Sequence, residues 1–145
     1  MELVIKQFQE LSVEELFEIY KLRVAVFVVE QQCPYQEIDD ADRSAYHAYL
    51  KDESGIQAYI RVLPKGISFD EVSLGRVIAV KRRCGLGSRI LSAGIQLAKE
   101  KFHADSIVIE AQVYARKLYE KAGFIPISDE FLEDGIPHIK MALHL

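Results

Sequence analysis

The most constraining feature of the sequence is a basic, glycine-containing turn between an apolar run and a helical pattern. The run Leu74–Val80 is rich in β-branched residues and is typical of a strand. The turn contains Gly85 and Gly87, and apolar residues at helical spacing then continue to about Phe102. Glycines let the backbone approach an anion closely, and a helix start presents unpaired N–H groups with about half a positive charge. This order of strand, turn and helix predicts an anion-binding cradle.

The charges around the turn favour an anion with several negative groups. Basic side chains gather within and beside it, namely Lys81, Arg82, Arg83 and Arg89. They stand out because the chain as a whole has a formal net charge of −4. The local excess of positive charge predicts a polyanionic ligand, and the acidic overall balance argues against nucleic acid as the main partner.

Glycine spacing separates three phosphate-binding patterns. A P-loop requires a lysine directly after its last glycine, where the chain has Ser88. A dinucleotide turn requires a third glycine at the position of Ile90, although Glu110 lies near the distance expected of a ribose ligand, so that alternative stays open. The third pattern, Arg/Gln-x-x-Gly-x-Gly/Ala, is satisfied in full by Arg82, Gly85 and Gly87.

The third pattern is the pyrophosphate turn of the GNAT superfamily of acyl-CoA-dependent N-acyltransferases, which the sequence resembles. Downstream, Gln112–Phe124 is similar to the GNAT element Asn-x-x-Ala-x-x-Leu-Tyr-Glu-Lys-x-Gly-Phe, with Gln112 in place of the asparagine. The segments Leu22–Asp39 and Glu133–His138 resemble the ElaA-like branch of the superfamily. The resemblance spans nearly the whole chain.

Length and pattern predict one α/β domain over residues 1–145. The chain has 145 residues, of which 50% are hydrophobic, enough for a substantial core. In chain order we expect a strand over Glu2–Phe8, a helix from the Ser12–Glu15 capping box, a hairpin of Ala45–Leu50 and Ile56–Leu63, the strand Leu74–Val80 with its helix, a strand over Ser106–Ala111, a helix over Tyr114–Lys121, and two final strands.

Such an order predicts a mixed sheet that is covered on both faces. The resemblance implies the GNAT fold, in which a central, mostly antiparallel sheet is splayed open and flanked by helices. The splay is expected between the strands at Leu74–Val80 and Ser106–Ala111, with CoA in the gap. Because dimers are common among similar proteins, the resemblance is also compatible with a homodimer.

Composition narrows the class of protein further. No apolar run approaches the ~20 residues of a membrane span, and the N-terminus lacks the pattern of a signal peptide. The two cysteines, Cys33 and Cys84, form no disulfide framework, and no Cys/His cluster has zinc spacing. We therefore expect a cytoplasmic protein without a metal or a membrane partner, with Cys33 buried and inert.

The resemblance implies acetyl-CoA as the co-substrate and assigns residues to it. Backbone groups of Ile78, Ala79 and Val80 are expected to pair with the pantetheine arm, and the Val80 amide to face the acyl oxygen. The side chain of Gln112 is expected to contact the same arm. The pyrophosphate is expected on the turn and the helix start, formed by Arg82, Arg83, Cys84, Gly85, Leu86, Gly87, Ser88 and Arg89.

The resemblance also makes Tyr119 the candidate acid that protonates the leaving sulfur. A phenol has an ordinary pKa of about 10 and can donate a proton to a thiolate. The alternative is a tyrosine that only packs the helix on the sheet, and we expect Tyr114 to be of that kind.

The candidate base is His138, because a histidine titrates close to neutral pH. Strand alternation predicts that it shares a face with Lys140, opposite Ile139 and Met141. A structural histidine is the alternative. Glu110 is a candidate for a water relay to the amine, and His47 is the second choice for the base. The remaining histidines, His103 and His144, are expected at the surface.

An acidic segment precedes the hairpin and contains Glu30, Glu37, Asp39, Asp40 and Asp42. Such a run is usually solvated surface. If it instead roofs the acceptor cleft, it would attract a cationic amine.

The leading hypothesis is an N-acetyltransferase that moves an acetyl group from acetyl-CoA directly to a primary amine in a ternary complex. A small-molecule acceptor is favoured because the chain has no evident peptide-binding segment. The alternatives are a non-catalytic acyl-CoA-binding or regulatory module and a transferase that uses a longer acyl-CoA.

Overall fold

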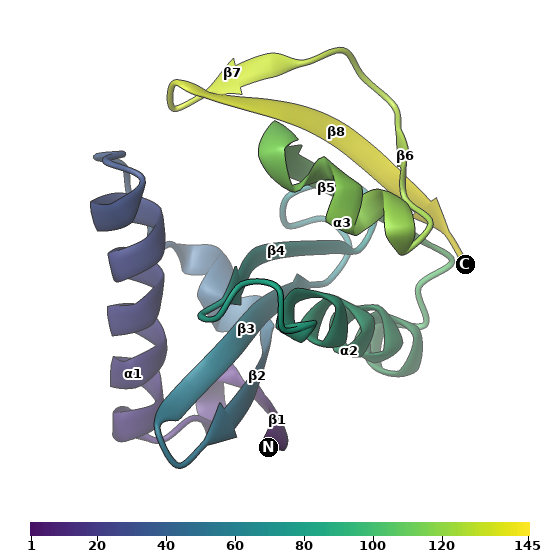
Figure 1. Cartoon of the computed structure of the whole chain (residues 1–145). Coiled ribbons are helices and arrows are strands. Elements are labelled where there is room, and N and C mark those ends of the chain that lie inside the picture. The colour runs from purple at the N-terminus through teal and green to yellow at the C-terminus, as the bar shows by residue number, and fades with distance from the viewer.

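The computed structural model describes residues 1–145 as two sheets with helices packed against them (Figure 1). The first sheet is antiparallel in the order β1-β2-β3-β4, with β1 at Glu2–Gln7, β2 at Tyr46–Asp52, β3 at Gly55–Leu63 and β4 at Ser73–Ala79. In the second sheet β8 (Ile136–His144) pairs with β5 (Ser106–Gln112), β6 (Ile125–Pro126) and β7 (Phe131–Glu133). The chain therefore ends in three strands, β6, β7 and β8, rather than in the expected two.

The two sheets meet at one short junction and diverge from it. The Val108 amide donates to the Val72 carbonyl at 3.0 Å, and Val72 forms a parallel bridge with Ile107. No further ladder joins β4 to β5, and the two strands separate along their length (Figure 1). The splayed sheet that the resemblance implied is therefore confirmed.

Helices cover both faces of the first sheet. Helix α1 (Val13–Val24) continues into a π-helical segment (Ala25–Glu30), and α2 is at Leu86–Phe102. Ile19 of α1 clusters with Tyr59 of β3, whereas Gly94 of α2 lies against Ile60, whose side chain points to the opposite face. The remaining elements are α3 (Arg116–Lys121) and 3₁₀ turns at Phe8–Glu10, Asp40–Ser44 and Val113–Ala115.

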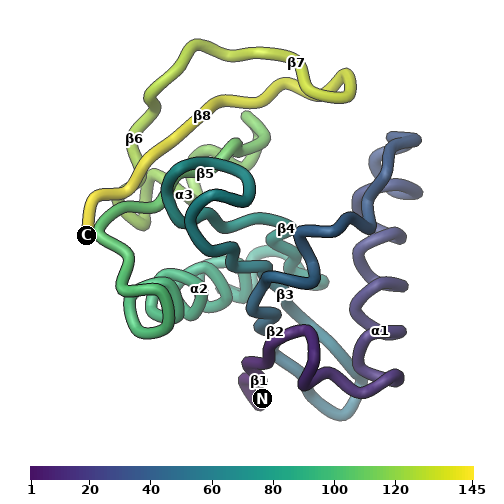
Figure 2. The backbone as a smooth tube through the Cα atoms, turned by 180° about the vertical axis from the view of Figure 1, so that it is seen from behind, coloured from purple at the N-terminus to yellow at the C-terminus, as the bar shows by residue number.

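Figure 2 shows the same arrangement from behind, with both termini at the rim of the molecule. The main core lies between α2 and the two sheets and includes Ile60, Ile90, Ile107 and Met141. The expected capping box is present, because the Glu15 amide donates to Ser12 Oγ at 3.1 Å and the Ser12 amide donates to the Glu15 carboxylate at 2.9 Å. No helix is long and apolar enough to cross a membrane.

A buried ion-pair network attaches the acidic segment to the sheet. Arg23, which is 0% exposed, contacts Glu37 and Asp42 at 2.7 Å each. Arg61 on β3 contacts Asp42 at 3.1 Å and Asp39 at 2.7 Å. The interpretation of this segment as solvated surface is therefore wrong for Glu37 and Asp42, because cations from distant parts of the chain pair with them.

These contacts keep Asp42 ionised despite its burial. Burial alone would raise the pKa of the Asp42 carboxyl, but the hydrogen bond and charge of Arg23, together with the charge of Arg61, lower that pKa below its usual range. An ionised buried carboxylate depends on its partner, so removal of Arg23 would leave negative charge without compensation.

We expect Arg23→Met to lower the free energy of unfolding by about 3–5 kcal/mol, because Glu37 and Asp42 would remain buried without their main cation. The measurement is urea denaturation at pH 7. The matched control is Lys21→Met on the exposed side of the same helix, for which we expect a change within about 0.5 kcal/mol. Equal effects of the two substitutions would contradict a stabilising role for the network.

Candidate active site

The turn that is predicted to bind an anion lies at the start of α2. The first hydrogen bond of the helix runs from the Arg89 amide to the Gly85 carbonyl at 3.1 Å. The amides of Leu86, Gly87 and Ser88 therefore have no partner within the chain. Gly85 has a φ of 75°, a left-handed conformation that glycine adopts without strain. The geometry matches an anion site, with free donors and a helix dipole directed at the same point.

Basic side chains of the turn remain at the surface beside these amides. Arg82 makes a 3.3 Å contact with Glu30, and both side chains are largely exposed. Arg83 and Cys84 are also exposed. Exposed guanidinium groups next to free amides can add charge to the binding of a pyrophosphate without first breaking a buried interaction.

Strand β4 carries a bulge where it borders the gap between the sheets. Gly75 is opposite Arg61 and Ile78 is opposite Tyr59, so that Arg76 and Val77 face the single residue Ile60. Arg76 has a φ of 54°, which is uncommon for a residue other than glycine. A bulge leaves one residue unpaired and redirects side chains, and here it provides free backbone groups next to the gap.

The Val80 amide is not available as the donor to the acyl oxygen, which corrects the sequence-based expectation. Its N–H donates to the Gln57 carbonyl at 2.9 Å, because Val80 continues the pairing of β4 with β3. The bulged residues Arg76 and Val77, which share one partner on β3, are the alternative source of a backbone donor. The sequence could not indicate a bulge at these positions, because neither residue is a glycine.

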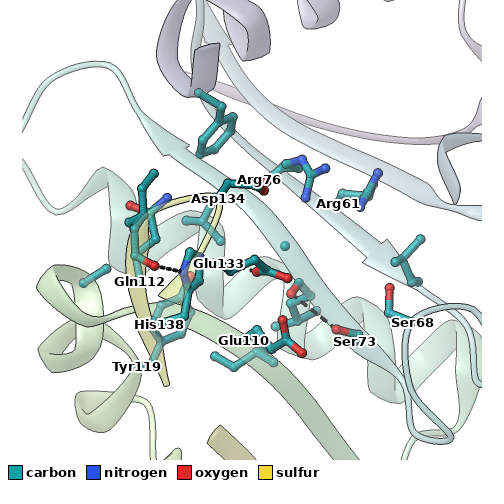
Figure 3. Close-up of a pocket in the computed structure, with 18 of the residues that line it drawn as sticks. Arg61, Ser68, Ser73, Arg76, Glu110, Gln112, Tyr119, Glu133, Asp134 and His138 are labelled. Atoms are coloured by element: carbon teal, nitrogen blue, oxygen red, sulfur yellow. Dashed lines mark hydrogen bonds and ion pairs between the residues drawn. The ribbon is translucent and has the colours of Figure 1, made fainter. Parts of the chain in front are cut away.

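A cavity of about 420 Å³ lies between the diverging sheets (Figure 3). The first sheet contributes Arg61 from β3 and Arg76 from β4. The second sheet contributes Glu110 from β5, Glu133 from β7 and His138 from β8. The structure thus brings the three predicted catalytic residues to one cavity, since it is also lined by Tyr119.

Tyr119 reaches the cavity from α3 with its hydroxyl unpaired. Its ring packs edge-on against Phe124 at a centroid distance of 5.8 Å, and the residue is 8% exposed. No hydrogen bond within the chain involves its hydroxyl, and burial raises its pKa above the usual range of tyrosine. The phenol therefore keeps its proton at neutral pH. Tyr114, expected as a packing residue, is instead 72% exposed, because it lies on the 3₁₀ turn before the helix.

His138 has one ring nitrogen fixed and one available. Its Nδ1–H donates to the Ile136 carbonyl at 2.7 Å, so the neutral ring carries its lone pair on Nε2. Nε2 lies 3.7 Å from the Glu133 carboxylate, and the ring stacks on Phe131. The predicted alternation of β8 is confirmed, because Ile139 and Met141 belong to the core on the other face. Nε2 is therefore the ring nitrogen that could act as a base.

Glu110 and Glu133 form a carboxylate pair beside His138. Burial raises the pKa of Glu110, and the nearby Glu133 raises it further, while His138 and Lys140 act in the opposite direction. No pattern in the sequence assigns a role to Glu133 directly. The indirect signal is the Asp134-Gly135 pair, which is typical of a tight hairpin and here has positive φ at both residues.

His47, the second choice for the base, is a structural residue. It is 0% exposed, its Nε2–H donates to the Asp42 carbonyl at 2.9 Å, and its Nδ1 accepts from the Tyr59 hydroxyl at 2.6 Å. Burial also lowers its pKa. Both nitrogens are used, so His47 cannot serve an acceptor. His103 and His144 are exposed, as expected.

Two further residues lie at the mouth of the gap. Gln112 exchanges two hydrogen bonds of 3.1 Å with Gln31, which joins the end of β5 to the π-helical segment. Its contact with the cofactor arm stays a prediction. Cys33 is 5% exposed, and its thiol contacts the Asp134 carbonyl at 3.6 Å, so the expectation that it is buried is confirmed.

A splayed antiparallel sheet with an anion cradle at one end of its gap and an acid–base cluster inside defines an acyl-CoA-dependent transferase fold. Residues 8–145 match the family model for the acetyltransferase (GNAT) domain, so the chain belongs to the GNAT acetyltransferase family. It is 40% identical over 149 residues to the Schizosaccharomyces pombe UPF0039 protein C11D3.02c, covering 100% of this chain and 98% of the relative.

The chain also resembles solved members of the family. Its sequence is 37% identical to Escherichia coli ElaA over 139 residues, which cover 92% of this chain and 90% of ElaA. The crystal structure of ElaA superimposes with a TM-score of 0.91, covering 99% and 100% of the two chains. An acyl-CoA N-acyltransferase from Pseudomonas aeruginosa gives the same TM-score at 32% identity, covering 99% of each chain.

We expect Glu133→Gln to lower the pKa of Glu110, because it removes the neighbouring negative charge that favours the protonated form. The measurement is a ¹³C NMR titration of the glutamate side-chain carboxyl signals. In the unaltered protein Glu110 should titrate above the ~4.3 of a free glutamate. Glu130→Gln, at an exposed position of the same connection, is the control and should leave the Glu110 titration in place. An unchanged titration in Glu133→Gln would contradict the coupling.

Proposed function

We propose that the chain transfers an acetyl group from acetyl-CoA directly to the primary amine of a small molecule in a ternary complex. The observation that carries the proposal is the convergence of Tyr119, His138 and Glu110 on one cavity beside the bulge of β4. The P. aeruginosa structure is that of an acyl-CoA N-acyltransferase, which supports the same class of reaction.

The residues present fit acetyl-CoA. The unpartnered amides of Leu86, Gly87 and Ser88, with Arg82 and Arg83 beside them, would hold the pyrophosphate. Backbone groups of Ile78–Val80 would pair with the pantetheine arm, and a free amide of the bulge would face the acyl oxygen. When bound, acetyl-CoA supplies the acetyl group as a thioester. One such amide donor is typically worth ~10²–10³ in rate.

Proton transfer divides between two residues of the cavity. His138 Nε2 accepts a proton from the acceptor amine, directly or through water held by Glu110, and Glu133 stabilises the imidazolium that forms. The protonated Tyr119 hydroxyl donates to the sulfur as it leaves.

Direct transfer is favoured because no nucleophile in the cavity is prepared for an acyl-enzyme. The Cys33 thiol contacts a backbone carbonyl, and the Ser73 hydroxyl contacts the Leu74 carbonyl at 3.5 Å. A nucleophile of this kind is normally activated by an adjacent base. A cytoplasmic location, a single functional domain and a homodimer stay predictions.

We expect Tyr119→Phe to lower kcat by about 10²–10³-fold while the Kd for acetyl-CoA changes less than about threefold, because only proton donation is lost. The measurements are thiol release from acetyl-CoA with an amine panel and calorimetric titration of acetyl-CoA, with NADH as a non-binding control. Tyr46→Phe, at a partly exposed tyrosine of β2 outside the cavity, is the matched variant and should behave like the unaltered protein.

The outcomes separate the hypotheses. Binding of acetyl-CoA without thiol release for any amine would favour the non-catalytic acyl-CoA-binding module. Unaltered turnover in Tyr119→Phe would make Tyr119 a packing residue. Absence of acetyl-CoA binding would remove the proposal as a whole.

We expect Gly85→Ala to weaken acetyl-CoA binding by about 5–30-fold, because a side chain in the left-handed conformation costs about 1–2 kcal/mol and the cradle would shift to relieve it. The control is Gly55→Ala in the β2–β3 hairpin, where φ is also positive, at 111°, and a Cβ likewise meets nothing within 4 Å. Both variants should lose similar stability, and Gly85→Ala alone should lose affinity in calorimetry. Equal affinities would place the pyrophosphate elsewhere.

A further inference from the structure

One wall of the cavity carries two arginines that the acetyl-transfer chemistry does not use. In Figure 3 the guanidinium groups of Arg61 and Arg76 lie side by side along this wall, and the side chains of Glu110, Glu133 and His138 lie across from them. The arginines belong to the first sheet and the acid–base cluster to the second. Asp39 also lines the cavity and pairs with both arginines, so this wall offers N–H donors rather than a net positive charge.

The Arg61 guanidinium group is held by ion pairs, but some of its N–H donors have no partner within the chain. Its side chain is 5% exposed, and one nitrogen, Nη1, makes both of its ion pairs, with Asp39 and Asp42. Its Nε is buried without a hydrogen-bond partner, and no contact within the chain involves Nη2. Arginine has five N–H donors in a fixed plane, and a buried donor left unpaired is costly. Because Nε has no exposed surface, the N–H groups of Nη2 are the Arg61 donors left for an acceptor atom in the cavity.

Arg76 presents a second, partly free guanidinium at the same wall. Its Nε contacts the Glu37 carboxylate at 2.9 Å and its Nη2 lies 3.5 Å from Asp39, while Nη1 makes no contact within the chain. The bulge of β4 and the positive φ of Arg76 direct this side chain toward the network. Backbone strain of this kind persists where the surrounding contacts determine it, and it clusters at binding sites.

Two adjacent guanidinium groups with free N–H donors recognise a planar, bidentate anion, for which a carboxylate is the simplest match. The opposite wall must accept the amine, since His138 Nε2 and the paired carboxylates lie there. A cavity of about 420 Å³ that also admits the acetyl end of the donor leaves room for a small acceptor.

We infer that the acceptor is a small amine that also carries a carboxylate, that is, an amino acid or a similar ω-amino acid. Its carboxylate binds between Arg61 and Arg76, and its amine faces His138. The inference rests on the proposed function and names the substrate class of that site. Transfer then forms the amide bond between the acetyl carbon and the amine nitrogen and breaks the thioester bond. One amine proton leaves through His138, and the CoA sulfur receives a proton from Tyr119.

The test compares each amino acid with its neutral amide. Glycine, β-alanine, 4-aminobutyrate and 5-aminopentanoate are assayed with acetyl-CoA beside glycinamide, β-alaninamide, 4-aminobutyramide and 5-aminopentanamide, with thiol release and mass of the N-acetyl product as readouts. We expect kcat/KM for at least one amino acid to exceed that of its amide by tenfold or more. The carbon-chain length of the amino acid with the highest kcat/KM indicates the distance between the two walls.

Variants add a second readout. Arg76→Gln should reduce the ratio of kcat/KM between the preferred amino acid and its amide to below about threefold, mainly through KM for the amino acid. Arg43→Gln, on an exposed side chain of the acidic segment outside the cavity, should keep the ratio. The ratio is measured within each variant, so it is insensitive to a general loss of folded protein.

The inference is overturned if no amino acid in the series exceeds its amide, whether or not the amides react, or if Arg76→Gln keeps the ratio. Failure of the proposed function is read separately, from calorimetric binding of acetyl-CoA, which requires no acceptor. Binding of acetyl-CoA and acetylation of the amides alone would leave the transferase proposal in place and exclude the carboxylate-bearing acceptor.

Discussion

The functional geometry depends on the short junction at which Val108 bonds to Val72. Because the two sheets are joined there and nowhere else along β4 and β5, the two strands can separate beyond the junction while their register at the junction is kept. Backbone N–H and C=O groups on the facing edges of β4 and β5 therefore have no partner strand beyond the junction. Such groups need a partner where the edge is buried. The cavity, the bulge of β4 and the acid–base cluster all lie beyond this junction.

A second constraint is the pairing of three buried or half-buried arginines with three carboxylates, formed by Arg23, Arg61 and Arg76 with Glu37, Asp39 and Asp42. The charges balance, which permits burial that would otherwise cost several kcal/mol per ion. The network attaches the segment after α1 to β3 and β4. It also fixes the guanidinium groups of Arg61 and Arg76 at the wall of the cavity, so that one arrangement would serve both stability and the inferred recognition of a carboxylate.

The placement of the arginines and of the acid–base cluster on opposite walls of the cavity follows from the topology. The first sheet carries the arginines, and the second carries Glu110, Glu133 and His138, which come together because β5 and β7 both pair with β8. The Glu110 pKa is raised by burial and by Glu133, while His138 keeps an available nitrogen. Glu110 thus acquires its properties from strands distant in sequence, whereas Glu133 and His138 are brought together by the β7–β8 hairpin.

Local patterns in the sequence determined the strand–turn–helix cradle, the capping box at Ser12 and the alternation of β8, because each depends on residues a few positions apart. Together with the motif of α3, these patterns also predicted the fold family and identified Tyr119, Glu110 and His138 as candidate catalytic residues. The partners of Glu37 and Asp42, the use of the Val80 amide, the burial of His47 and the arginine wall of the cavity were decided by tertiary structure alone. Each depends on a hydrogen bond or ion pair between distant segments, and a linear pattern of charges carries no information about which distant group will compensate them.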